Sequence, residues 1–150
     1  MSLLLFLVCL VLSCGYALIR GGAPERIAAA LMIGAFVAGI PLHLFVSAAD
    51  YRSLALGGAA IDAVLLLALI VLAWRSTRYW PLWVAAWQVA TVLAHTAKLL
   101  DPTMQATGYA IQAQIWGYPM VLAAGVGAWR HRQRRKAGFP DPAWKSMVSS

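Results

Sequence analysis

Charged side chains are scarce in this sequence. Lys, Arg, Asp and Glu make up 11% of its 150 residues, whereas a soluble domain carries about 25%. Acids are rarest, with 5 Asp and Glu against 12 Lys and Arg, and there are 2 cysteines. So few charges cannot cover the surface of a soluble protein of this size. This excludes an ordinary cytosolic enzyme, a disordered chain and a disulfide-rich secreted module.

Apolar residues take the place of the missing charges, at 62% of the chain. A helix that crosses a bilayer needs about 20 mostly apolar residues, and five segments approach that length. Their apolar residues lie all round the helix, which is typical of lipid exposure. The sequence therefore predicts an all-α fold, a single bundle of five transmembrane helices in residues 1–129. The predicted spans are about 2–19, 27–48, 54–74, 80–100 and 108–129, followed by a basic cytoplasmic tail at 130–150.

The positive charges of the predicted loops are distributed unevenly. Cytoplasmic loops of membrane proteins carry an excess of Lys and Arg. With the N-terminus outside, the outer loops hold only Arg52 and Lys98. The other ten cations then lie inside: Arg20, Arg26, Arg75, Arg78, Arg130, Arg132, Arg134, Arg135, Lys136 and Lys145. We therefore predict a multi-pass inner-membrane protein with its N-terminus outside and its C-terminus cytoplasmic.

Several polar residues interrupt the predicted spans at similar depth. At about 1.5 Å per residue, they fall in the outer half of the membrane. In the fourth span, Gln88, Thr91, His95 and Lys98 follow a helical spacing and share one face. Intramembrane ionisable groups usually face the bundle interior. The pattern predicts an outward-facing polar pocket, made by His43, Asp62, His95, Lys98, Tyr109 and Gln112.

Three interpretations of this pocket stay open. Its polar groups could hydrogen-bond neighbouring helices and do no more than pack. Alternatively, Asp62 and His95 could share a proton, with Gln112 and Tyr109 orienting a small ligand or a quinone head group. In the third interpretation, His43 and His95 ligate a b-type haem from two parallel helices. A lone Asp62 is costly in lipid, so we expect it to be neutral or paired with Lys98 or a protonated His95.

A basic run follows the last predicted span directly. Its cations are Arg130, Arg132, Arg134, Arg135 and Lys136. Each is worth about 1 kcal/mol of attraction to an anionic leaflet, so we expect lipid contact, with docking to an acidic partner as the alternative. Beyond it, Gly138 and the prolines indicate a loosely ordered tail. Without a predicted soluble domain, nucleic-acid binding is not expected.

These patterns predict a small integral membrane protein with a polar pocket. It would be a subunit or accessory of a larger membrane complex, or a homo-oligomer that handles a ligand or a proton. The alternatives are a haem b- or quinone-binding redox subunit and a purely structural interaction protein. The sequence contains no HExxH or comparable motif, so it predicts no metal site beyond the haem alternative. It assigns no catalytic residues and leaves the cofactor unknown.

Overall fold

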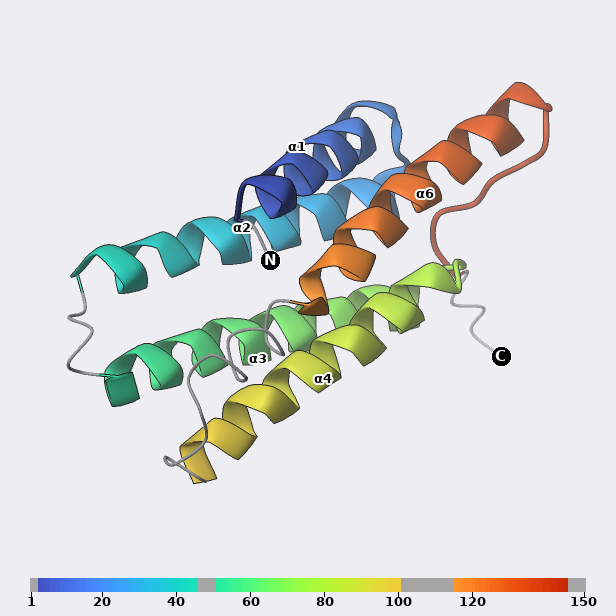
Figure 1. Ribbon diagram of the computed structural model, residues 1–150. Helices are drawn as coiled ribbons and strands as arrows, with labels where there is room; N and C mark the ends of the chain where they lie inside the picture. Colours follow the sequence, from blue (N-terminus) through green and yellow to red (C-terminus); the bar gives the residue numbers. More distant parts are fainter. Residues whose placement is uncertain (1–2, 46–50, 101–114, 146–150) are drawn as a thin grey trace, which may run out of the picture.

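The computed structural model describes residues 3–45, 51–100 and 115–145, and within them it does not describe the side chains of 43, 45, 51, 52 and 54. Its five described helices are α1 (Leu3–Arg20), α2 (Ala23–Phe45), α3 (Tyr51–Arg75), α4 (Trp80–Leu100) and α6 (Gly117–Lys136). The all-α prediction is confirmed (Figure 1).

The helices form a closed bundle. Each of α1, α2, α3 and α4 packs against the next helix along the chain, and α6 packs against both α4 and α1. A further contact between α2 and α6 crosses the bundle. Small residues let the helices approach closely at its centre, where Ala17, Ala28 and Ala124 are fully buried.

The turn between α1 and α2 shows how the sequence ends one helix and begins the next. The backbone N–H of Gly21 still donates to the carbonyl of Ala17, at 2.9 Å. A Cβ atom at Gly21 would lie 2.4 Å from that carbonyl oxygen, so only glycine fits there. Pro24 then stands in the first turn of α2, where its missing N–H is not needed.

Three helical segments, and not five, are long and apolar enough to cross a membrane among the described residues. They are Leu3–Arg20, Ala23–Leu42 and Ala55–Arg75, and they correspond to the first three predicted spans. These three candidate spans indicate a multi-pass membrane protein. Helix α4 has the predicted bounds, but its tryptophans and polar residues lower its hydropathy. Helix α6 is described from Gly117 and ends in a basic run.

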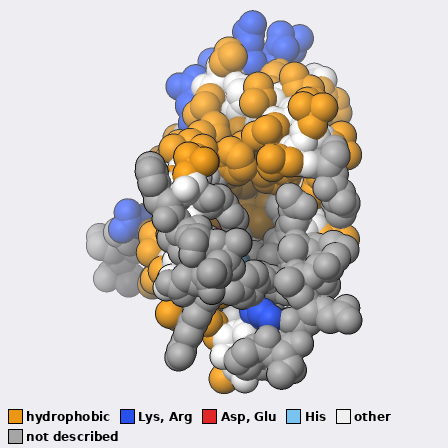
Figure 2. Space-filling model, turned by 60° about the vertical axis from the view of Figure 1, so that its left-hand side comes forward, with side chains coloured by type: hydrophobic (Ala, Val, Ile, Leu, Met, Phe, Trp, Pro, Cys, Tyr) orange, Lys and Arg blue, Asp and Glu red, His pale blue; other side chains and the backbone are white. Residues whose placement is uncertain are grey.

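The outer surface of the bundle is largely apolar. Figure 2 shows apolar side chains over much of one face, with the largest group of Lys and Arg at one end. Leu4, Leu12, Leu67 and Leu93 are among the large apolar residues that are more than half exposed. Such a surface is unfavourable in water and suits contact with lipid.

Candidate functional site

The polar stripe of α4 faces the interior. Gln88, Thr91, His95 and Lys98 are all buried, with 2%, 7%, 8% and 7% of their surfaces exposed. Val84, one turn before Gln88, and Ala94 are also buried on this side of α4, whereas Val89 and Leu93 are exposed on the other side. The helical spacing in the sequence therefore identified the inward face of α4 correctly.

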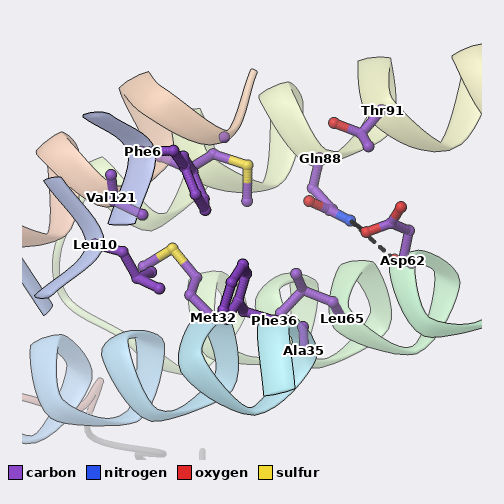
Figure 3. Close-up of a pocket in the computed structure, with 12 residues that line it drawn as sticks. Phe6, Leu10, Met32, Ala35, Phe36, Asp62, Leu65, Gln88, Thr91 and Val121 are labelled. Atoms are coloured by element: carbon purple, nitrogen blue, oxygen red, sulfur yellow. Dashed lines mark hydrogen bonds between the residues drawn. The ribbon is translucent and has the colours of Figure 1, made fainter. Parts of the chain in front are cut away.

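This stripe meets Asp62 of α3. The Nε2 atom of His95 lies 2.7 Å from Oδ2 of Asp62. The side-chain amide of Gln88 donates to Oδ1 of Asp62 at 2.9 Å and to the Asp62 backbone carbonyl at 3.1 Å, as Figure 3 shows. Both carboxylate oxygens of Asp62 are thus held from α4. His95 is one of the two partners expected for Asp62.

A glycine brings the histidine ring against α3. A Cβ atom built on Gly58 would lie 3.1 Å from Cε1 of His95, a spacing tighter than nearly all real contacts. Gly58 stands four residues before Asp62, so both lie on one face of α3. The missing side chain at Gly58 lets the ring lie close enough to α3 for Nε2 to reach the carboxylate.

Asp62 borders a cavity of about 190 Å³ between the helices of the bundle. Asp62, Gln88 and Thr91 form its polar end, and Figure 3 shows them opposite a cluster of aromatic, aliphatic and thioether side chains. In that cluster the ring of Phe6 lies 6.0 Å from Phe36 and 5.4 Å from Tyr118, centroid to centroid. All five described helices line the cavity, with residues Phe6, Leu10, Met32, Ala35, Phe36, Asp62, Leu65, Gln88, Thr91, Gly117, Met120 and Val121.

The other predicted pocket residues are placed in part. Lys98 is buried one helical turn beyond His95 on the same face of α4. His43 lies in α2, but its side chain is outside what the structure describes, and Tyr109 and Gln112 lie outside the described residues. The aromatic cluster around Phe6 was not predicted, because a buried Phe in a span has no distinctive sequence signal.

A second buried ionic cluster lies at the basic end of the bundle, and the sequence analysis missed it. Glu25, in the first turn of α2, is fully buried. Its Oε1 lies 3.1 Å from Nε of Arg78, which precedes α4, and it accepts a hydrogen bond from the indole of Trp80 at 3.3 Å. We define the basic-end cluster as Glu25, Arg78, His131, Arg134 and Asp141.

Asp141 joins the chain beyond α6 to this cluster. Its Oδ1 accepts from Arg78 at 2.7 Å and from Arg134 at 2.9 Å, and its Oδ2 lies 2.6 Å from Nδ1 of His131. Burial raises the pKa of Asp141, but the hydrogen bonds from Arg78, His131 and Arg134 outweigh it and hold that pKa well below its usual range. Asp141 is therefore ionised throughout the physiological range.

The basic run is helical and the following segment is docked, so the expectation of a loose tail is wrong for residues 130–145. Helix α6 continues to Lys136, because Arg, Gln and Lys are good helix formers. After Gly138, with φ +74°, the chain turns back. Trp144 then pairs antiparallel with Ser76, and the N–H of Lys145 donates to the Arg75 carbonyl at 2.9 Å.

The cations of the run face different surroundings. Arg134 points to Asp141, and its side chain is 37% exposed. Arg130, Arg132, Arg135 and Lys136 are exposed. The lipid or partner contact predicted for this run therefore rests on these four side chains, while Arg134 also holds the chain that follows.

The bis-histidine haem alternative depends on His43, whose side chain lies outside what the structure describes. An axial histidine binds iron through one ring nitrogen and donates from the other, and in His95 the nitrogen placed on Asp62 is Nε2. The ring also lies against Gly58, which leaves little space on that side. Among the described residues, no three His, Cys, Asp or Glu side chains come close enough together to hold a metal ion.

Fold and site together define a small all-α protein with three helices long and apolar enough to cross a membrane, a partly buried Asp–His pair beside a cavity, and a buried ionic cluster at the basic end. The chain matches no family model, and neither a curated protein nor a solved structure is significantly similar to it. Its function must therefore be inferred from these side chains.

Proposed function

We propose that this chain is an inner-membrane protein that binds a small amphipathic molecule in the cavity of its bundle. Asp62 anchors the polar group of the ligand and shares a proton with His95. The single observation that carries the proposal is the 2.7 Å contact of His95 with Asp62, whose carboxylate belongs to the lining of a 190 Å³ cavity. The N-terminus lies outside and the C-terminus in the cytoplasm, as the distribution of cations in the sequence favours.

In this proposal α4 and α6 lie in the membrane beside the three candidate spans. The polar residues that lower the hydropathy of α4 are buried against α3, and so they do not meet lipid. Both helices also line the cavity, through Gln88 and Thr91 of α4 and through Met120 and Val121 of α6. Without α4 and α6, the cavity would be open to the acyl chains of the lipid.

The energy of the Asp62 site argues against packing alone. A carboxylate at the centre of a span costs about 2.5–3.5 kcal/mol on insertion scales. Hydrogen bonds between membrane helices return about 0.6 kcal/mol each on average, so the two bonds from Gln88 do not offset that cost. Gln88 would still hold α4 to the backbone of α3 without an acid, through its bond to the carbonyl of residue 62. An ionisable pair at this depth is better explained by a proton or ligand that uses it.

The size and lining of the cavity indicate the ligand class. An apolar cavity of about 150 Å³ holds a molecule the size of benzene, and this cavity is slightly larger. Its aromatic and aliphatic wall suits one ring, and Asp62 suits a hydroxyl or carbonyl group on that ring. A quinone or phenol head group has this chemistry. The protein could carry out this role alone, as a homo-oligomer or as an accessory subunit of a membrane complex.

Phenol is a suitable probe of this proposal, because it combines one ring with one hydroxyl. The full-length protein in neutral detergent should bind phenol, measured by calorimetry, at least tenfold more tightly than toluene, which lacks the hydroxyl. Ala35→Leu fills the cavity from α2 and should abolish binding. Ala38→Leu is the matched control, since Ala38 is exposed on the same helix, and it should bind like the wild type.

Two results would contradict the proposal. Equal binding of phenol by the Ala35→Leu and Ala38→Leu proteins would place the ligand elsewhere. Unchanged binding in Asp62→Asn and His95→Gln would leave these side chains with a packing role. In that case the structural interaction protein would be the better interpretation.

A further inference from the structure

A groove lies at the basic end of the bundle, apart from the Asp62 cavity. Its volume is about 720 Å³, and its lining comes from the start of α2, the end of α3 and the segment after α6. The lining residues are Ile27, Trp74, Arg75, Trp144 and Lys145. Two of these five are cations, two are indoles and one is aliphatic, so the groove is both positively charged and apolar.

The docked segment after α6 completes the groove. Trp144 pairs with Ser76, the Thr77 N–H donates to the Ala143 carbonyl at 3.3 Å, and the Lys145 N–H donates to the Arg75 carbonyl at 2.9 Å. These backbone bonds bring Lys145 beside Arg75, although the two residues are far apart in the sequence. The basic-end cluster fixes the same segment through Asp141.

The groove stands where lipid headgroups are expected. Candidate span Ala55–Arg75 ends at Arg75, so its last residue marks the edge of the hydrocarbon region. Trp74 is 77% exposed and Trp144 41% exposed at this level, and exposed indoles are typical of the interface. Ile27, 41% exposed, begins the apolar surface of α2.

From this arrangement we infer that the groove binds one anionic phospholipid. Arg75 and Lys145 hold the phosphate, which arginine can bind through two parallel hydrogen bonds. Trp74, Trp144 and Ile27 line the path of the glycerol and the first acyl carbons. The described lining contains no acid that would repel the phosphate. The inference goes beyond the proposed function, since it uses none of the residues of the Asp62 cavity.

Native mass spectrometry of the full-length protein can count the bound lipid. The protein in neutral detergent is mixed with phosphatidylglycerol or phosphatidylcholine at equal ratio. We expect the wild type to retain one phosphatidylglycerol in preference to phosphatidylcholine. The Arg75→Gln/Lys145→Gln protein should lose about 30-fold in apparent affinity, about fivefold for each cation near a phosphate. Trp144→Ala should weaken retention without changing the net charge.

The matched control is Arg132→Gln/Arg135→Gln, which removes two exposed cations of α6 outside the groove. It changes net charge equally and should keep the bound lipid. Equal losses in the two double variants, or equal retention of phosphatidylcholine, would overturn the inference in favour of diffuse attraction. Phenol binding should be unchanged in both double variants, so failure here is distinguishable from failure of the proposed function.

Discussion

Two of the acids that the structure describes, Asp62 and Glu25, have different surroundings. The side chain of Asp62 is 21% exposed, borders a cavity and contacts side chains of α4. Glu25 is fully buried, and its partner Arg78, in the turn before α4, also contacts His131 of α6 and Asp141 of the segment after it. Asp62 thus lies beside a cavity, whereas Glu25 belongs to a network of buried ion pairs.

The partners of the two acids extend this difference. Arg78 and Arg134 keep their charge at any pH that proteins meet, so Glu25 and Asp141 of the basic-end cluster each face at least one arginine whose charge is fixed. Asp62 faces a histidine, a residue type whose charge can change near neutral pH. The comparison teaches that burial of an acid does not by itself indicate function. Glu25 is paired with an arginine, whereas Asp62 is paired with a histidine and lines a cavity, and these differences distinguish the candidate binding site from the buried acid of the basic-end cluster.

The largest effect should come from Arg78→Gln. This change leaves Glu25 and Asp141 buried without their shared cation, and breaking a buried ion pair costs about 3–5 kcal/mol. The free energy of unfolding, measured by titrating a denaturing detergent into mixed micelles, should fall by that amount. Arg130→Gln removes an exposed cation from α6 and should change it by less than about 0.5 kcal/mol. A similar small change for Arg78→Gln would show that the network is not structural.

Asp141→Asn should have the next largest effect, about 2 kcal/mol at neutral pH, because three charge-assisted hydrogen bonds lose their charge. The pKa of Asp141 is lowered by folding, so the stability from its charge is complete above its ordinary pKa of about 3.9 and is lost as pH falls through the folded value. The thermal midpoints of the wild type and the Asp141→Asn protein should therefore differ by a constant amount from pH 5 to pH 8 and converge in acid.

The comparison of thermal midpoints with and without Asp141→Asn is best made in a His131→Gln background, because histidine side chains can change charge near neutral pH. Removing His131 also removes one contact of Asp141, which leaves Arg78 and Arg134 to lower its pKa. A gap that closed between pH 8 and pH 5 would contradict the lowered pKa. It would also weaken the contrast between the basic-end cluster and the Asp62 site.

The smallest loss should come from Asp62→Asn, about 1–2 kcal/mol. The asparagine oxygen can still accept from Gln88, so the change removes the charge that faces His95 but keeps the bond to α4. The free energy of unfolding of Asp62→Asn, His95→Gln and the double variant should show a non-additive coupling, as expected for residues in contact. A loss as large as that of Arg78→Gln, with no effect on phenol binding, would remove the distinction between the two acids.

Hydropathy and helical spacing predicted much of the fold and one of the two clusters. The first three spans and the bounds of α4 follow from apolar runs, and the inward face of α4 follows from the spacing of Gln88, Thr91 and His95. Asp62 stood out because an acid in an apolar run is costly. These signals are local, since they depend on residues within a few helical turns.

The basic-end cluster has no such local signal. Glu25, Arg78 and Asp141 lie far apart in the sequence. Glu25 and Arg78 are next to polar residues that suggest a solvated helix end, and Asp141 stands between two prolines. The prolines beside Asp141 indicated a loose tail, yet they fit the extended segment that docks on residues 75–77. The predicted end of the last span at residue 129 marks where apolar residues stop, but α6 continues to Lys136 because helix formation does not require apolar side chains.

The docked segment also sets an order of events during synthesis. The ribosome releases the chain from its N-terminus, and Asp141 follows Arg78 by 63 positions. While α4 and α6 are being made, Glu25 is thus the acid already available to Arg78. The bonds of Asp141, Ala143 and Lys145 form only after α6 has been translated, because these residues follow it in the chain. The groove at Arg75 therefore forms only after every described helix has been made, and an occupied groove would mark a chain whose segment after α6 has docked.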